Sequence, residues 1–376
     1  MPENNFPEKR EKQIKEPPKR NEKSWWIKTT LLLLLVVLSI VMLFTLGNYL
    51  TGEENPQLTF PQLLKAINYP FLLLLLGVIS CYILVESSKY SYMLKIYTGK
   101  FLFRTSVKTM FLGKYYDGIT PMSTGGQPFQ IYYLHKKDIP SGAATAIPIM
   151  RYIVQIFILS TLSIVLLAVT PKFLEQSTVN TTVLILSWVS LVVNAMLPVI
   201  VILFSIFPRP CKKVIMLVIK LLVRLKLVKH WYKIASKYLR ELEGYSDAIK
   251  QFWKQLYKFI PVILLSFIEV GLFVTIPFFV VIAIGNVEPT LNLAIQIACL
   301  VIITRYTALL IPTPGNTGAA EAASSIVFVT VAGIGSVIGW VILVWRFLTY
   351  YVYILSGIGI NIFEITRSAL RNKRAK

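Results

Sequence analysis

The amino-acid sequence predicts an all-α polytopic membrane protein with about six transmembrane helices and two inverted re-entrant helical hairpins. The first observation is hydropathy: 55% of the 376 residues are hydrophobic, more than a soluble globular domain of this length carries. The second is that Lys and Arg concentrate in segments between the apolar runs. The third is a pair of similar motifs rich in Pro and Gly, one in each half of the chain and each inside an apolar segment.

Six apolar segments approach or exceed the roughly 20 residues that cross the hydrocarbon core of a bilayer. We expect these spans at residues 29–50, 69–87, 141–170, 182–207, 259–284 and 336–364. The first follows a charged tail and lacks a small-residue cleavage pattern after it, so we interpret it as a span and not as a signal peptide. The membrane part therefore has a first half, residues 29–207, and a second half, residues 259–364.

Three basic segments flank or separate these halves. Residues 1–28 and 365–376 are expected to be tails. Residues 208–258 are expected to form amphipathic helices along the inner leaflet, because Val and Leu recur there at helical spacing opposite Lys and Arg. A cytoplasmic helical hairpin with its own small core is the alternative for this segment.

The distribution of positive charge predicts the orientation. The formal net charge is +21, and 33 of the 39 Lys and Arg fall in segments that the predicted topology puts on one side, including residues 87–108. Only Lys65 and Lys172 fall on the other side. Basic loops stay in the cytoplasm during insertion, so we expect a multi-pass plasma-membrane protein with both termini cytoplasmic. This segregation favours anionic lipids of the inner leaflet as partners and argues against nucleic acid.

Two motifs interrupt apolar segments where plain helix would otherwise be expected. Each contains Thr-Pro, two further residues, Thr and Gly, at residues 120–125 and 313–318. Pro lacks the amide hydrogen and Gly lacks backbone restraint, so together they break helices. Broken backbone is tolerated in a membrane only where protein buries it or where it lines a cavity. The breaks are expected at Pro121, Pro128, Pro312 and Pro314.

We therefore expect one re-entrant hairpin at residues 109–133, entered from the cytoplasm, and a second at residues 291–332, entered from outside. Two full spans in place of the second hairpin would put the basic tail outside, against the distribution of charge. Each half then contains a span, a re-entrant hairpin and a span with one arginine. This is the pattern of inverted repeats in transporters.

Matched broken segments in two halves indicate a binding site near the midplane of the membrane. Half-helices that begin at the breaks direct their positive ends toward an anion. An arginine inside the membrane needs compensation, which a phosphate supplies through a bidentate contact. The expected substrate-binding residues are Gly125, Gly126, Gln127, Gln130, Arg151, Arg305, Gly315, Gly318, Glu321 and Arg346.

Each of these residues also has a structural interpretation, which the sequence leaves open. The glycines act as packing hinges, the glutamines bond to backbone freed by the prolines, and the membrane arginines form internal ion pairs. Arg305 extends to an interface, and Glu321 caps a half-helix in place of binding an ammonium group or taking a proton. The carboxylates available as charge partners are Asp117, Glu269 and Glu321.

We expect no catalytic chemistry, cofactor or metal site in this chain. The three cysteines are scattered, and the two histidines, His135 and His230, fall in predicted cytoplasmic loops. The sequence contains no phosphate-binding loop, paired-His motif or nucleophile elbow.

The two motifs resemble signatures of the lysylphosphatidylglycerol synthase transmembrane-region family. Residues 120–134 read TPMSTGGQPFQIYYL and are similar to its first signature, and residues 312–321 read PTPGNTGAAE and resemble its second. The similarity covers nearly the whole chain after the N-terminal tail. Members of this family include the flippase half of multiple peptide resistance factors.

The resemblance implies a flippase-like protein that translocates an anionic or aminoacylated phospholipid, such as lysylphosphatidylglycerol, between leaflets. One alternative is the membrane subunit of a phosphatidylglycerol lysyltransferase that works with a separate lipid aminoacyl-transferase. Another is a transporter of a polyprenyl-linked or small anionic substrate. Full-length resistance factors add a soluble transferase domain, whereas this sequence ends at Lys376, and other branches of the family have an arginine near the position of Gln130.

Overall fold

The computed structural model describes, besides isolated positions near the N-terminus, residues 57–121, 123–173, 181–206, 256–311, 313–331 and 334–374. Within these ranges every regular element is helical. The predicted tail at residues 1–28, Pro312, and most of residues 29–50 and 208–258 lie outside the described residues.

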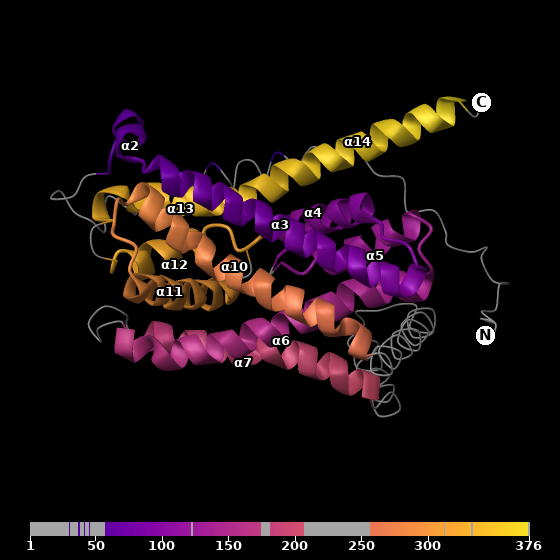
Figure 1. Ribbon diagram of the computed structural model, residues 1–376, viewed down its shortest axis with the longest axis horizontal. Helices are drawn as coiled ribbons and strands as arrows, with labels where there is room; N and C mark the ends of the chain where they lie inside the picture. Colours follow the sequence, from indigo (N-terminus) through magenta and orange to yellow (C-terminus); the bar gives the residue numbers. More distant parts are fainter. Residues whose placement is uncertain are drawn as a thin grey trace, which may run out of the picture.

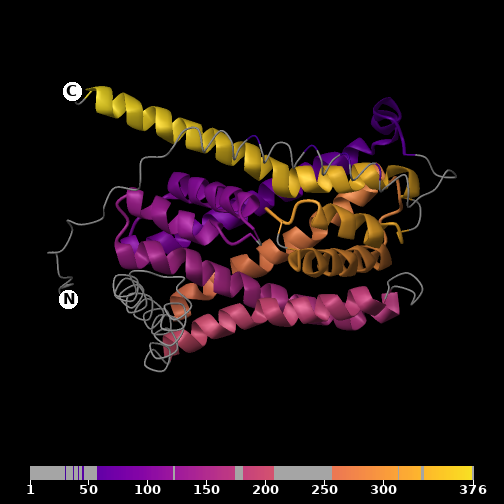
Figure 2. The same cartoon turned by 180° about the vertical axis from the view of Figure 1, so that it is seen from behind.

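Four long helices run along the long axis of the molecule (Figure 1). These are α3 (Tyr69–Thr98), α6 (Ser141–Phe173), α7 (Thr181–Ile206) and α10 (Ile260–Ile284). α3 and α10 pack against each other, and α6 and α7 lie side by side along one face of the bundle (Figures 1 and 2). Buried aliphatic and aromatic side chains from all four helices contribute to one hydrophobic core.

Five helices among the described residues are long and apolar enough to cross a membrane. Four of them coincide with predicted spans: Tyr69–Thr98, Gly142–Pro171, Tyr257–Ile284 and Gly335–Glu364. The fifth, Leu291–Leu309, is the predicted first arm of the second hairpin. Large apolar side chains on the outside of the bundle remain exposed, as expected where the solvent is lipid. The chain is an all-α polytopic membrane protein.

The two segments predicted as hairpins each contain two packed helices with a break between them. The first consists of α4 (Phe103–Ile119) and α5 (Gly126–Lys136), and the second of α11 (Leu291–Leu309) and α12 (Ala319–Phe328). They occupy opposite ends of the molecule, and their breaks meet near its middle (Figures 1 and 2).

Pro128 was predicted as a helix break, and this prediction is wrong. It lies in the first turn of α5, which continues to Lys136. The amide groups of a first helical turn have no intrahelical partner, so the missing N–H of proline costs nothing there.

The last predicted span is one long element made of three pieces. Helix α13 (Ile338–Arg346) is followed by the π-helical turn η3 (Phe347–Tyr351) and by α14 (Val352–Arg374). The short helix α2 (Phe60–Ala66) lies near the start of α13 (Figure 1). The remaining elements are 3₁₀ turns, η1 (Leu256–Phe259) and η2 (Gly335–Val337).

The position of Lys89 differs from the predicted distribution of charge. The second span was expected to end near residue 87, but α3 continues to Thr98. The Lys89 side chain is fully buried and pairs with Glu269 of α10. It is therefore not one of the cytoplasmic charges of residues 87–108, because a carboxylate distant in sequence compensates it inside the bundle.

Candidate functional site

The two sequence motifs contact each other directly at the hairpin tips. The amide of Gly315 donates a hydrogen bond of 3.2 Å to the carbonyl of Thr120. Pro121 and Pro314 form an isolated antiparallel β-bridge. Buried backbone groups that a helix break frees need partners, and here each tip supplies some of those partners to the other.

Tyr350 strengthens this contact from a third element, the π-helical turn η3. Its hydroxyl donates to the carbonyl of Gly118 at 2.9 Å and accepts from Thr317 Oγ1 at 2.9 Å. One side chain therefore joins both hairpin tips. π-Helical turns are frequent at functional sites. The sequence analysis did not single out Tyr350, since a tyrosine in an apolar span carries no distinguishing pattern.

Each hairpin uses a carboxylate to cap its second arm. Asp117 Oδ1 accepts from the amide of Gly126 at 2.7 Å, at the start of α5. Glu321 Oε2 accepts from the amide of Gly318 at 2.7 Å, at the start of α12. A carboxylate is favoured at the positive end of a helix. Both acids thus have the structural role that the sequence left open for Glu321.

The two tip glycines are needed for different reasons. A Cβ on Gly126 would lie 2.5 Å from the carboxylate oxygens of Asp117. Gly318 has open space around that position but a φ of +82°, which L-residues rarely adopt. The cap therefore excludes a side chain at the first tip, and the backbone conformation disfavours one at the second.

Arg346 forms one of the expected ion pairs. Its Nε donates to Glu321 Oε1 at 2.9 Å, and its guanidinium lies 4.4 Å from the centre of the Tyr350 ring. Glu321 therefore bonds both to the α12 amide and to Arg346. The pair keeps the buried guanidinium compensated close to the second hairpin tip.

Arg151 has a partner that the sequence analysis missed. Its Nη1 lies 3.1 Å from Glu86 Oε1, and Lys114 Nζ lies 3.1 Å from the other oxygen of Glu86. Lys114 also donates to the hydroxyl of Tyr82 at 2.8 Å. Glu86 is on α3, close to the predicted end of the second span at residue 87, and was not among the carboxylates expected as charge partners.

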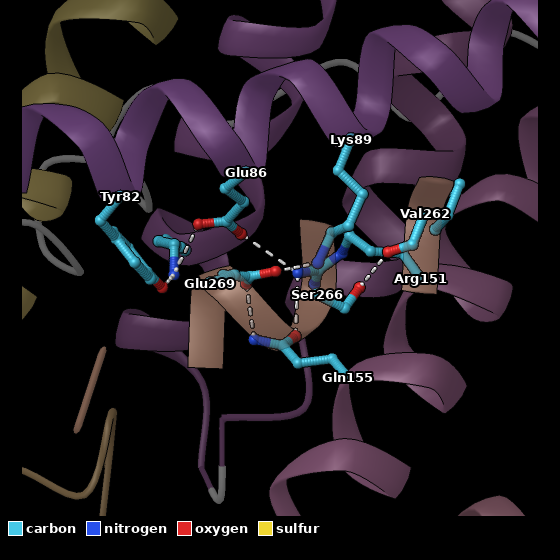
Figure 3. A network of polar contacts seen from close by, with 9 residues as sticks. Tyr82, Glu86, Lys89, Arg151, Gln155, Val262, Ser266 and Glu269 are labelled. Atoms are coloured by element: carbon cyan, nitrogen blue, oxygen red, sulfur yellow. Dashed lines mark hydrogen bonds and ion pairs between the residues drawn. The ribbon is translucent and has the colours of Figure 1, made fainter. Parts of the chain in front are cut away.

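The ion pairs of Glu86 form one part of a buried polar network. The second part is centred on Glu269 of α10 (Figure 3). Glu269 pairs with Lys89 and accepts from Gln155 Nε2 at 2.9 Å. The Oε1 of Gln155 accepts from Arg151 Nη1 at 3.0 Å. Gln155 thus connects the two ion-pair groups, and Figure 3 shows Glu86 and Lys89 projecting from one helix toward these partners. Buried charges persist when they are paired and hydrogen-bonded in this way.

A cavity of about 310 Å³ lies between the hairpin tips and this network. Both tips contribute to its wall, through Gln127 of the first and Gly315 of the second. Helices α6, α10 and α11 supply an apolar part of the wall that includes Leu159, Val270 and Phe273. Its charged lining residues are Lys114, Asp117, Arg151, Glu269, Arg305 and Arg346.

Arg305 differs from the other cations of the cavity. It is half-buried on α11, with its guanidinium 5.6 Å from the centre of the Phe273 ring. Within the described ranges no carboxylate lies within ion-pair distance of it. The structure places Arg305 in the cavity wall, whereas the alternative from sequence was extension to an interface.

Several buried polar atoms of cavity-lining residues have no protein partner in the described part of the chain. They are Arg151 Nε, Thr304 Oγ1, Asn316 Oδ1 and Arg346 Nη2. A buried donor or acceptor without a partner costs about 1–3 kcal/mol. No cluster of His, Cys, Asp or Glu suited to a metal ion was found among the described residues.

The cavity unites some of the predicted site residues and not others. Arg151, Arg305, Arg346, Gln127 and Gly315 line it. Four others form hydrogen bonds within the hairpin tips and lie outside that lining: Gly125, Gly126, Gly318 and Glu321.

Gln130 lies away from the cavity. Its Nε2 donates to the carbonyl of Thr109 at 3.3 Å inside the first hairpin, in the middle of α4 and not at the backbone freed by the prolines. Its role in this structure is to join α5 to α4.

A family model described as "Lysylphosphatidylglycerol synthase TM region" matches residues 31–357 of the chain. No match was found among curated proteins or among solved structures. The matched region includes both hairpins, the buried network and every residue that lines the cavity. By this match over most of its length, the chain belongs to the lysylphosphatidylglycerol synthase TM region family.

Proposed function

We propose that this protein translocates a phospholipid headgroup between the two leaflets of the plasma membrane. The substrate is a phosphate-containing lipid of the phosphatidylglycerol class, either anionic or aminoacylated. The observation that carries the proposal is the cavity between two inverted hairpin tips, which is lined by Lys114, Arg151, Arg305 and Arg346.

The physical obstacle to lipid translocation is the charged headgroup. Moving an unpaired phosphate through hydrocarbon is costly, because nothing there replaces its hydration. The cavity offers guanidinium groups for bidentate contacts to phosphate oxygens. Its apolar walls on α6, α10 and α11 suit contact with acyl chains that remain in the bilayer.

Access alternates, in this proposal, through the hairpin tips. The tip contact consists of a few hydrogen bonds, among them those of Gly315 and Tyr350. Each is worth about 0.5–1.5 kcal/mol net. Their combined strength is small enough for a bound headgroup to shift the balance between closed and open tips.

The hairpins are re-entrant in this proposal, with α4–α5 entering from the cytoplasm and α11–α12 from the outside. The basic outer end of the first hairpin supports this orientation. Lys108 and Lys137 there lie 2.9 Å and 3.1 Å from oxygens of Glu364 on α14. Basic residues at the cytoplasmic ends of membrane helices follow the positive-inside rule.

The family description favours a second function, that of the membrane subunit of a lipid-modifying synthase with a separate aminoacyl-transferase as partner. Leaflet-resolved lipid analysis of a deletion strain separates the two. Translocation predicts a normal total of the affected lipid with a depleted outer leaflet. Loss of a lipid species from both leaflets would favour the synthase role and contradict the proposal.

A further inference from the structure

We propose that the cavity selects a lipid headgroup of net negative charge, with Arg305 as the residue that receives its phosphate, and disfavours a lysylated headgroup. This inference rests on the proposed function and narrows its substrate to one of two chemistries. A phosphatidylglycerol headgroup carries one negative charge on its phosphodiester. Esterification with lysine adds two ammonium groups and makes the net charge +1.

The ionisable groups around the cavity have a net positive charge. Within the described residues, the cations in or directly behind the cavity are Lys89, Lys114, Arg151, Arg305 and Arg346. The carboxylates are Glu86, Asp117, Glu269 and Glu321. One positive charge is therefore in excess when all are ionised. A monoanionic headgroup neutralises it, whereas a lysylated headgroup doubles it.

Three of the carboxylates near the cavity are already paired with cations of the protein. Glu86, Glu269 and Glu321 each face a cation of the protein and are almost completely buried. Glu86 and Glu321 do not line the cavity, and Glu269 already bonds to Lys89 and Gln155. At these three carboxylates an incoming ammonium group would have to compete with cations already in place, and Asp117, which also lines the cavity, uses Oδ1 to cap α5. Like charges in a site of low dielectric repel strongly.

Arg305 occupies a different environment from the other cations that line the cavity. It is the lining cation with no carboxylate within ion-pair distance in the described ranges, so no internal pair must break when it binds an anion. Its guanidinium is half-buried in the cavity wall and offers donors in a planar fork for the oxygens of a phosphate.

The test measures lipid flipping by the purified full chain in phosphatidylcholine vesicles. Acyl-labelled phosphatidylglycerol, lysylphosphatidylglycerol or phosphatidylethanolamine is added in trace amount, and an impermeant quencher reports each leaflet. We expect phosphatidylglycerol to flip at least tenfold faster than the lysylated lipid, a difference of about 1.4 kcal/mol. Arg305→Gln should slow phosphatidylglycerol about tenfold, and Arg305→Lys should slow it less. The exposed Arg104 provides the control, since Arg104→Gln should leave both rates unchanged.

Arg305→Glu is the decisive variant because it predicts a gain that misfolding cannot produce. It changes the excess charge of the site from +1 to −1. The variant should therefore flip the lysylated lipid faster than phosphatidylglycerol. A wild-type protein that moves the lysylated lipid at least as fast as phosphatidylglycerol would overturn the inference and leave the proposed function standing. Retention of the wild-type preference by Arg305→Glu would also overturn it.

A binding measurement separates failure of this inference from failure of the proposed function. Calorimetry on the detergent-solubilised full chain compares soluble glycerophosphoglycerol with inorganic phosphate. Binding of glycerophosphoglycerol that Arg305→Gln weakens tenfold, without flipping of any lipid, would support the anion site and contradict translocation. Binding of inorganic phosphate alone would identify a free anion as the ligand and overturn the assignment to a lipid headgroup.

Discussion

The amide of Gly315 donates a hydrogen bond to the carbonyl of Thr120 at 3.2 Å, joining the tip of one hairpin to the tip of the other. The two residues belong to similar motifs in opposite halves of the chain. Their contact means that neither tip is an independent loop. Any movement of one hairpin must break or remodel the backbone partner of the other.

Valine at either tip glycine should eliminate transport. At Gly126 the new side chain would collide with the Asp117 cap of α5, and at Gly318 it would force a β-branched residue into a positive-φ conformation. Such backbone strain costs about 1–3 kcal/mol. The reconstituted flip assay measures both, with Gly271→Val on α10 as the control because nothing lies within 4 Å of its added Cβ. Wild-type transport by Gly318→Val would show that the second tip tolerates the change and would refute the two-tip mechanism.

Removal of the Tyr350 hydroxyl should loosen the tip contact. Tyr350→Phe deletes the hydrogen bonds to Gly118 and Thr317, worth about 1–3 kcal/mol together. We expect cysteines introduced at Thr120 and Asn316 to cross-link more slowly in this variant. Tyr132→Phe, at an exposed position of α5, is the control. Equal cross-linking rates in all three proteins would mean that Tyr350 does not hold the tips together.

Neutralising Glu86 alone should destabilise the fold more than neutralising Glu86 and Arg151 together. Glu86→Gln leaves Arg151 and Lys114 facing each other without their shared carboxylate, and loss of one member of a buried pair costs about 3–5 kcal/mol. The double variant Glu86→Gln with Arg151→Gln removes the uncompensated guanidinium and should recover part of that loss. Thermal unfolding of the detergent-solubilised protein measures both. A double variant no more stable than Glu86→Gln would argue against coupling of this pair.

At Arg346 a lysine should not replace the arginine fully. The guanidinium uses Nε for Glu321 and retains Nη2 without a protein partner in the described ranges, whereas an ammonium group provides a single point of charge. We expect Arg346→Lys to insert normally and to flip lipid several-fold more slowly, and Arg346→Gln to flip none. Normal flipping by Arg346→Gln at equal protein level would remove this residue from the substrate site.

Site-directed labelling should place the outer ends of the two hairpins on opposite sides of the membrane. In a background without Cys81, Cys211 and Cys299, a cysteine at the exposed Lys136 should react only from inside. A cysteine at the exposed Glu288, between α10 and α11, should react only from outside. Reaction of residue 136 from outside would contradict a hairpin entered from the cytoplasm.

The membrane class could be predicted from the sequence alone, as could four of the long apolar helices that can cross a membrane and the positions of both hairpin tips. These features depend on local quantities: the length of an apolar run, the missing amide of proline and the freedom of glycine. Pro128 was misjudged because the same missing amide is harmless in a first helical turn.

Which charges meet depends on the packing of the helices. Glu86 and Lys89 lie near the predicted end of the second span at residue 87, yet α3 continues past them and their partners are on α4, α6 and α10. Tyr350 and the contact between Thr120 and Gly315 likewise depend on segments far apart along the chain. Burial makes such pairing obligatory, but the identity of each partner follows from how the helices pack.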